Sequence, residues 1–155
     1  LNKFPVEQWN NARVHMIRSR IIHVLRGEVL CLKKKRIFCF GGAFSIDRAY
    51  RTLNKSYWKE EVPSEEDYEN GNKNLKVDYV ITHTCPLNLI PSLGGYHSAM
   101  EERQLQNYLQ YVNETVYDSL TRWYFGHWHR DQEFGEKFRV IYLDLVDMET
   151  GKKIW

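Results

Sequence analysis

The sequence lacks the features that mark membrane, secreted and disordered proteins. No apolar run approaches the roughly 20 residues of a membrane helix, and no signal peptide is visible at the start. No repeat, low-complexity segment or long tail of one charge stands out. The three cysteines, an odd number without a Cys-x-x-Cys spacing, fit neither a disulfide scaffold nor a zinc ribbon. We therefore expect a cytoplasmic protein with reduced thiols and no membrane partner.

The composition is that of one ordinary globular domain. The 155 residues are 43% hydrophobic, 14% aromatic and 27% charged, which predicts a real core and a single domain over 1–155. The formal net charge is only +2, so a dedicated nucleic-acid surface is not expected. The oligomeric state is left open by the sequence.

Hydrophobic patterning predicts a strand-rich first third, followed by strands mixed with helices. Ser64 before an acidic turn predicts the N-cap of a short helix, and the spacing of Leu105 and Leu109 predicts a second helix over 100–115. Residues 1–12 are expected to form a loop or a short helical approach. Apolar and β-branched runs predict strands at 14–17, 21–25, 28–32, 36–40, 77–82, 123–125 and 138–146. The predicted class is α/β, with helices packed on sheets.

Three of the six histidines lie where a predicted strand ends. His83 follows one strand, and His127 and His129 follow another. Side chains at such strand ends converge on a crevice where ligands collect. Imidazole suits Zn, Fe, Ni and Cu and tolerates Mn, so the three are candidate metal ligands, with an exposed polar pair as the alternative. The others are expected to be sheet or solvent-facing residues: His15, His23 and His97.

Four blocks of the sequence stand in the order of one enzyme family. Gly-Gly-Ala-Phe-Ser-Ile-Asp-Arg occupies 41–48, and Tyr-Trp-Lys-Glu-Glu-Val-Pro follows at 57–63. The strand before His83 continues into Thr-Cys-Pro at 84–86, and Phe-Gly-His-Trp-His occupies 125–129. Together these blocks resemble the calcineurin-like metallophosphoesterases of bacteria and phages. The resemblance implies a double β-sheet sandwich flanked by helices, with two divalent metal ions at its centre.

The resemblance also implies residue roles and a reaction. His83 and His127 would bind one metal ion and His129 the other, with Mn, Fe or Zn as the metal and a phosphomonoester or phosphodiester as the substrate. Ions about 3.5–4 Å apart would acidify a bridging water and neutralise the phosphoryl oxygens during in-line attack. Arg48 and Arg51, which follow the glycine block, are candidate substrate-binding residues, with an ion pair to a neighbouring aspartate as the alternative.

The sequence lacks several motifs that the same family uses. It contains no Asp-x-His, Gly-Asp or Asn-His, which in the family supply a bridging aspartate and further ligands, and no catalytic residue is identified in the chain. Three neutral imidazoles do not offset the repulsion between two dications, so at most one weakly held ion and little or no phosphatase activity are expected from these residues alone. Because the chain begins Leu-Asn-Lys, we expect it to be the carboxy-terminal portion of the domain, truncated at its N-terminus.

Two other functions compete with a phosphoesterase. One is a non-catalytic binding or regulatory domain that keeps the fold without the metal carboxylates. The other is a single-metal histidine site unrelated to phosphate, which leaves the glycine block and the Trp-Glu-Pro stretch without a role. The substrate is not specified, because the family's motifs bind the phosphoryl group rather than its leaving group.

Overall fold

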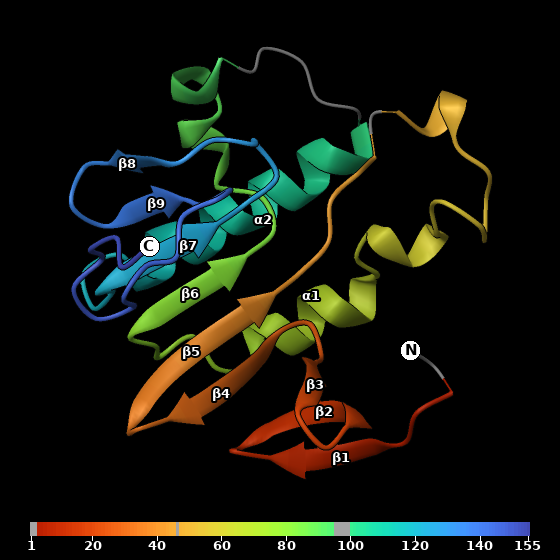
Figure 1. The fold of residues 1–155 in the computed structure, drawn as a ribbon, viewed down its shortest axis with the longest axis horizontal. Coiled ribbons are helices and arrows are strands. Elements are labelled where there is room, and N and C mark those ends of the chain that lie inside the picture. The colour runs from red at the N-terminus through yellow and green to blue at the C-terminus, as the bar shows by residue number, and fades with distance from the viewer. Residues whose placement is uncertain (1–2, 46, 95–99) are drawn as a thin grey trace.

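The computed structural model describes residues 3–45, 47–94 and 100–155, and it contains two β-sheets and two α-helices within them (Figure 1). His97 lies outside the described residues. The smaller sheet is antiparallel and has the order β1-β2-β3. Its strands are β1 (Val6–Trp9), β2 (Ala12–Arg18) and β3 (Ile21–Val24). The described chain is therefore α/β, as the sequence predicts.

The larger sheet has six strands in the order β4-β5-β6-β7-β9-β8. Strands β5, β6, β7 and β9 run parallel, and β4 and β8 are antiparallel edges. The carboxyl ends of the parallel strands therefore meet at one edge of the sheet. The bounds are β4 (Glu28–Leu32), β5 (Lys35–Phe40), β6 (Tyr79–Thr82), β7 (Arg122–Phe125), β8 (Gln132–Phe134) and β9 (Phe138–Val140).

Both α-helices cover one face of the larger sheet. Figure 1 shows α2 (Met100–Val116) passing behind β6, β7 and β9, with α1 (Glu65–Asn72) beside it. Ser64 caps α1 as predicted, because its hydroxyl accepts the Asp67 N–H and the Asp67 carboxylate accepts the Ser64 N–H. No helix in the described ranges is long and apolar enough to cross a membrane. The described residues also form four 3₁₀ helices: η1 (Arg48–Tyr50), η2 (Lys59–Glu61), η3 (Leu87–Leu89) and η4 (Pro91–Leu93).

The core has two parts, one on each face of the larger sheet. Between the sheet and the helices, Phe38, Val80 and Trp123 pack against Leu105 and Leu109 of α2. On the opposite face, the smaller sheet contributes a separate cluster with four residues of the larger sheet. That second cluster consists of Ala12, Val14, Leu30, Ile37, Tyr79 and Tyr124, all nine-tenths buried or more. The larger sheet is thus covered by helices on one face and by the smaller sheet on the other.

Two predictions about the ends of the chain are wrong. Residues 6–9, expected as a loop or helical approach, form strand β1, because a turn at Asn10 and Asn11 with φ of 48° and 68° returns the chain onto β2. The strand expected at 138–146 ends at Val140. Beyond it the Asp131 carboxylate accepts the backbone N–H groups of residues 142–144, which therefore leave the sheet ladder.

Candidate metal centre

His83 and His127 lie side by side at the carboxyl edge of the larger sheet. His83 follows β6 directly, and His127 follows β7 after Gly126, whose N–H donates to the His83 carbonyl at 3.0 Å. His127 has φ of 72°, a left-handed conformation that costs a non-glycine residue about 1–3 kcal/mol. The turn after β7 therefore holds the His127 ring toward β6 at a cost in backbone energy. The sequence predicted this meeting, because neighbouring parallel strands end at the same edge.

The two rings are oriented like ligands of one ion. His83 Nε2 and His127 Nδ1 are 3.2 Å apart, the ring centroids are 5.0 Å apart and the ring planes meet at 69°. Two imidazole nitrogens that each lie about 2.1 Å from one ion, at an angle of about 100°, would be about 3.2 Å apart with centroids about 5.0 Å apart. Both separations agree with that arrangement, and in the metal-free chain the two nitrogens form a hydrogen bond. The pair therefore fits a single divalent metal ion.

A second histidine pair has the same nitrogen separation but a different orientation of the rings. His15 and His23 face each other across β2 and β3, with their Nδ1 atoms 3.2 Å apart. Their rings are nearly parallel, at 10°, and the centroids are 5.4 Å apart. A straight N–H···N hydrogen bond would place the centroids about 5.5 Å apart. The nitrogens of this pair therefore face each other rather than a common ion.

The surroundings favour the neutral form of His83 and His127. Partial desolvation lowers the pKa of both imidazoles, and neighbouring histidines lower it further. Metal binding needs a neutral imidazole, so a lowered pKa keeps the ligand form present near neutral pH. His83 is exposed and His127 is half-buried, which leaves the pair open to an ion from solvent.

His129 does not join the pair. Its ring is exposed and stacks on Tyr142, with centroids 4.9 Å apart. Its backbone φ is 47°, and it influences His83 and His127 only by lowering their pKa electrostatically. Among the described residues, no group of three or more histidine, cysteine, aspartate or glutamate side chains is placed to hold a metal ion. The described geometry therefore brings together two of the three histidines that the sequence singled out.

The two predicted substrate-binding arginines have different environments. Arg51 pairs with Asp47, with Nη2 and Nε at 2.7 and 2.8 Å from one carboxylate oxygen, so its charge is neutralised. The Arg48 guanidinium lies 4.1 Å from the Phe44 ring centroid and 5.2 Å from that of Tyr57. Its Nε and Nη2 are buried and have no hydrogen-bond partner in the described structure. Neither arginine has a hydrogen bond or ring contact with the histidine pair in those same ranges.

Glu102 was not predicted from the sequence, and it is a buried carboxylate. Glu102 belongs to the first turn of α2 and is only 3% exposed. It accepts the Phe44 N–H at 2.6 Å, and burial raises the pKa of its carboxyl above the usual value. A signal was present in the helical spacing, because Glu102 lies three and seven residues before the core residues Leu105 and Leu109. This spacing places Glu102 on the same buried face of α2 as these two leucines.

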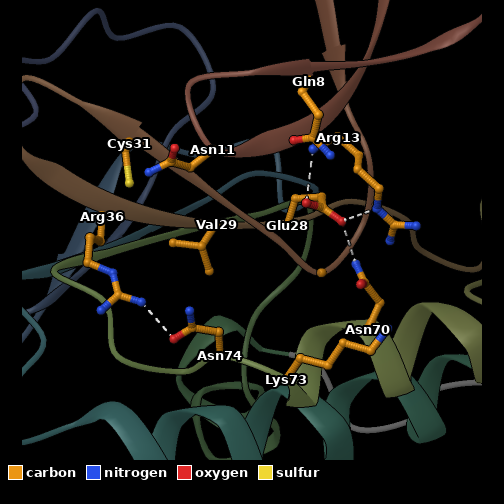
Figure 2. Close-up of a pocket in the computed structure, with 11 residues that line it drawn as sticks. Gln8, Asn11, Arg13, Glu28, Val29, Cys31, Arg36, Asn70, Lys73 and Asn74 are labelled. Carbon is orange, nitrogen blue, oxygen red and sulfur yellow. Dashed lines mark hydrogen bonds and ion pairs between the residues drawn. The ribbon is translucent and has the colours of Figure 1, made fainter.

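A polar pocket of about 790 Å³ lies away from the histidines, between the smaller sheet, β4 and the end of α1 (Figure 2). Glu28 accepts hydrogen bonds from the Arg13 Nε at 2.7 Å, the Arg13 N–H at 3.0 Å and the Asn70 amide at 2.9 Å. Burial alone would raise the pKa of Glu28, but these hydrogen bonds bring it below the usual value. Arg36 in turn donates to Asn74 at 2.6 Å. These bonds tie the smaller sheet to β4 and α1, so the polar groups have a structural use.

The histidine pair is therefore the centre in the described chain whose geometry and charge suit chemistry. It combines two imidazoles aimed at one point with surroundings that lower the pKa of both. Comparison with known proteins adds no relative to this picture. No protein-family model, curated protein or solved structure matches the chain.

Proposed function

We propose that this chain carries part of a metal-dependent phosphoesterase site, in which His83 and His127 bind one divalent ion. The observation that carries the proposal is the geometry of the pair, 3.2 Å between nitrogens and 5.0 Å between centroids. The four sequence blocks that resemble metallophosphoesterases supply the reaction class. A metallophosphoesterase-type double sheet belongs to the same proposal, and the two sheets with helices on one outer face support it.

In this proposal the histidines bind the metal ion and an arginine binds the substrate phosphate. A bound divalent ion supplies Lewis acidity, which polarises a phosphoryl oxygen and acidifies water. His83 and His127 hold that ion in the neutral state that their lowered pKa values favour. Arg48 and Arg51 are the candidates for binding the substrate phosphate: Arg48 has two buried guanidinium nitrogens without a hydrogen-bond partner in the described residues, and Arg51 would have to exchange its ion pair with Asp47 for the phosphate.

The residues do not fit a second metal ion by themselves. His129 is the remaining histidine for it, and its ring stacks on Tyr142 instead of facing the pair. The Asp-x-His, Gly-Asp and Asn-His motifs that would add carboxylate and amide ligands do not occur in the 155 residues. We therefore assign no step to a second ion within these residues.

Calorimetric titration with Mn²⁺, Zn²⁺ and Co²⁺ tests the metal site. We expect the purified chain to bind one ion, and His83→Ala and His127→Ala each to weaken binding at least tenfold. His23→Ala is the matched control, because its pair has the same nitrogen separation without a common point for an ion. Folded protein that binds none of the three metals would contradict the proposal.

Hydrolysis of p-nitrophenyl phosphate and its bis-ester with Mn²⁺ tests the reaction class. Metal-dependent turnover that His127→Ala abolishes would support a phosphoesterase. The missing carboxylate motifs favour the second candidate, a non-catalytic binding or regulatory domain. Tight binding of one ion with no turnover of either ester would select that candidate.

A further inference from the structure

The polar pocket between the smaller sheet, β4 and the end of α1 carries an unbalanced positive charge. Three of the described residues that line it are cations, and Glu28 is the one carboxylate among them. Arg13 pairs with Glu28, with Nε at 2.7 Å from Oε1, so these two charges offset each other. No described carboxylate forms an ion pair with Arg36 or Lys73. The pocket therefore has two uncompensated positive charges.

Both of these charges belong to the side of the pocket that the end of α1 forms. The Arg36 guanidinium points toward this end, where its Nη2 donates to the Asn74 Oδ1 at 2.6 Å (Figure 2). Lys73 precedes Asn74 in the chain, is the C-cap residue of α1 and is exposed. The Asp78 carboxylate accepts the Arg36 backbone N–H at 2.7 Å and is not among the described lining residues. Because the acceptor of the guanidinium is a neutral amide, a charged acceptor would bind it more strongly.

Charge and volume define the kind of ligand that fits. A phosphate monoester carries about −1.5 to −2 charges at pH 7, which matches two cations, whereas a carboxylate carries one. The carbonyl end of α1 opposes an anion, so both side-chain charges are needed to hold it. The volume of about 790 Å³ lies in the range of pockets that hold small organic molecules. Beyond the cations, Val29 offers an apolar contact, and Gln8 and Asn11 offer amides to an organic group.

We propose that this pocket binds a small organic phosphate monoester, with its phosphate at Arg36 and Lys73 and its organic part against Val29. None of the described lining residues belongs to the candidate metal centre, so the inference does not depend on the proposed function. The hydrogen bonds of Glu28 keep their structural use, because they hold the smaller sheet, β4 and α1 in the arrangement that forms the pocket.

Calorimetric titration of the purified chain with AMP, inorganic phosphate and adenosine at pH 7.5 tests the site. EDTA in the buffer removes any contribution of a metal ion at the histidine pair. We expect AMP and inorganic phosphate to bind, and adenosine, which has the same organic part as AMP without the phosphate, to bind more weakly than AMP. A chain that binds neither phosphate would refute the proposal, and adenosine that binds as tightly as AMP would refute the role of the cations.

Three charge variants locate the phosphate. Arg36→Gln should weaken AMP binding about tenfold, the effect of losing a hydrogen bond between charged groups. Lys73→Gln should weaken it about two- to fivefold, because an exposed ion pair contributes less. Lys76→Gln is the matched control, because Lys76 is exposed on the same segment and is not among the described lining residues. It should bind AMP like the wild type.

Cys31 reports the position of the ligand independently of affinity. It lines the pocket and lies opposite Arg36 on the neighbouring strand. AMP should slow the alkylation of Cys31 by iodoacetamide in proportion to the occupied fraction of the protein. Cys39 and Cys85 are internal controls, because they are not among the described lining residues and burial raises their pKa to about 11 and 12. AMP that binds without protecting Cys31 would place the ligand elsewhere and refute the pocket.

The remaining outcomes separate this site from the proposed phosphoesterase site. His127→Ala should bind AMP like the wild type, whatever the metal titrations show. AMP binding that Arg51→Gln abolishes and Arg36→Gln preserves would place the phosphate at the phosphoesterase site and overturn this inference. If Arg36→Gln fails to fold, Lys73→Gln decides the question, because it changes an exposed side chain at the end of a helix. Wild-type affinity of that variant would then refute the site.

Discussion

Replacing Gly71 with alanine should destabilise the protein, although alanine is the better helix former. Gly71 is the penultimate residue of α1, where alanine would normally add up to about 1 kcal/mol of stability. A Cβ atom at this position would overlap the Tyr108 hydroxyl and approach the Phe38 ring at 3.2 Å. The Tyr108 ring has no easy way to move, because it packs against the rings of Phe40 and Tyr68 at 4.9 and 4.8 Å.

The expected size of the effect follows from these two opposing terms. Overpacking a filled site costs about 1–3 kcal/mol. Subtracting the helix-propensity gain leaves a net loss of about 1–2 kcal/mol in the free energy of unfolding for Gly71→Ala. The Tyr108 hydroxyl is buried and has no hydrogen-bond partner in the described residues, so Tyr108→Phe alone should be neutral or stabilising.

Urea unfolding of the single and double variants measures the coupling. In Gly71→Ala combined with Tyr108→Phe the overlap with the hydroxyl is gone and only tight contacts with two rings remain, so we expect most of the lost stability to return, with a coupling energy of about 1–2 kcal/mol. Asn72→Ala, at the exposed last residue of the same helix, is the control and should gain a few tenths of a kcal/mol. A stabilising Gly71→Ala, or a coupling near zero, would refute the reasoning.

Three further predictions concern pH, packing and thiol reactivity. Folding lowers the pKa of His83 and His127 from 6.5, so the unfolded chain binds protons at a higher pH than the folded protein does. The urea concentration at the midpoint of unfolding of the metal-free protein should therefore decrease when the pH is lowered from 7.5 to 5.5. An unchanged or higher midpoint would contradict this. Asn70→Ala removes a donor to Glu28 and should lower the free energy of unfolding by about 1–3 kcal/mol in the same assay. Cys85 is fully buried with its pKa raised to about 12, so it should be the last thiol that a thiol reagent labels in native protein, and early labelling would contradict the packing.

The regular strands and helices were predictable because their local signals agree with their packing. The hairpin of β4 and β5 is an example that the sequence predicted. Its turn contains two left-handed residues, Lys33 and Lys34. The side chains of its strands alternate between the two core clusters. Strand β1 was missed because its four residues are all exposed and show no apolar alternation. Its signal was the Asn10–Asn11 pair, a composition that suits the two left-handed positions of a tight hairpin turn.

The candidate site was predictable only where the backbone determines it. Parallel strands bring the residues after β6 and β7 together, so the meeting of His83 and His127 follows from strand order alone. The direction of the His129 ring depends on a turn in which His127 and His129 both have a left-handed φ, and a pattern of two histidines does not report φ. Glu102 was hidden for another reason. Glutamate side chains are usually exposed to solvent, so the residue type predicts an exposed position. Only the helical spacing from the core residues of α2 indicates that Glu102 is buried.

The two histidine pairs show why distance alone does not define a metal site. Both pairs place ring nitrogens 3.2 Å apart, yet their centroids differ, 5.4 Å in the smaller sheet and 5.0 Å at the strand ends. In the first pair the rings are nearly parallel and the nitrogens face each other. In the second the ring planes meet at 69° and the nitrogens are turned toward a third point. The orientation of the rings, rather than the separation of their nitrogens, therefore distinguishes the two pairs.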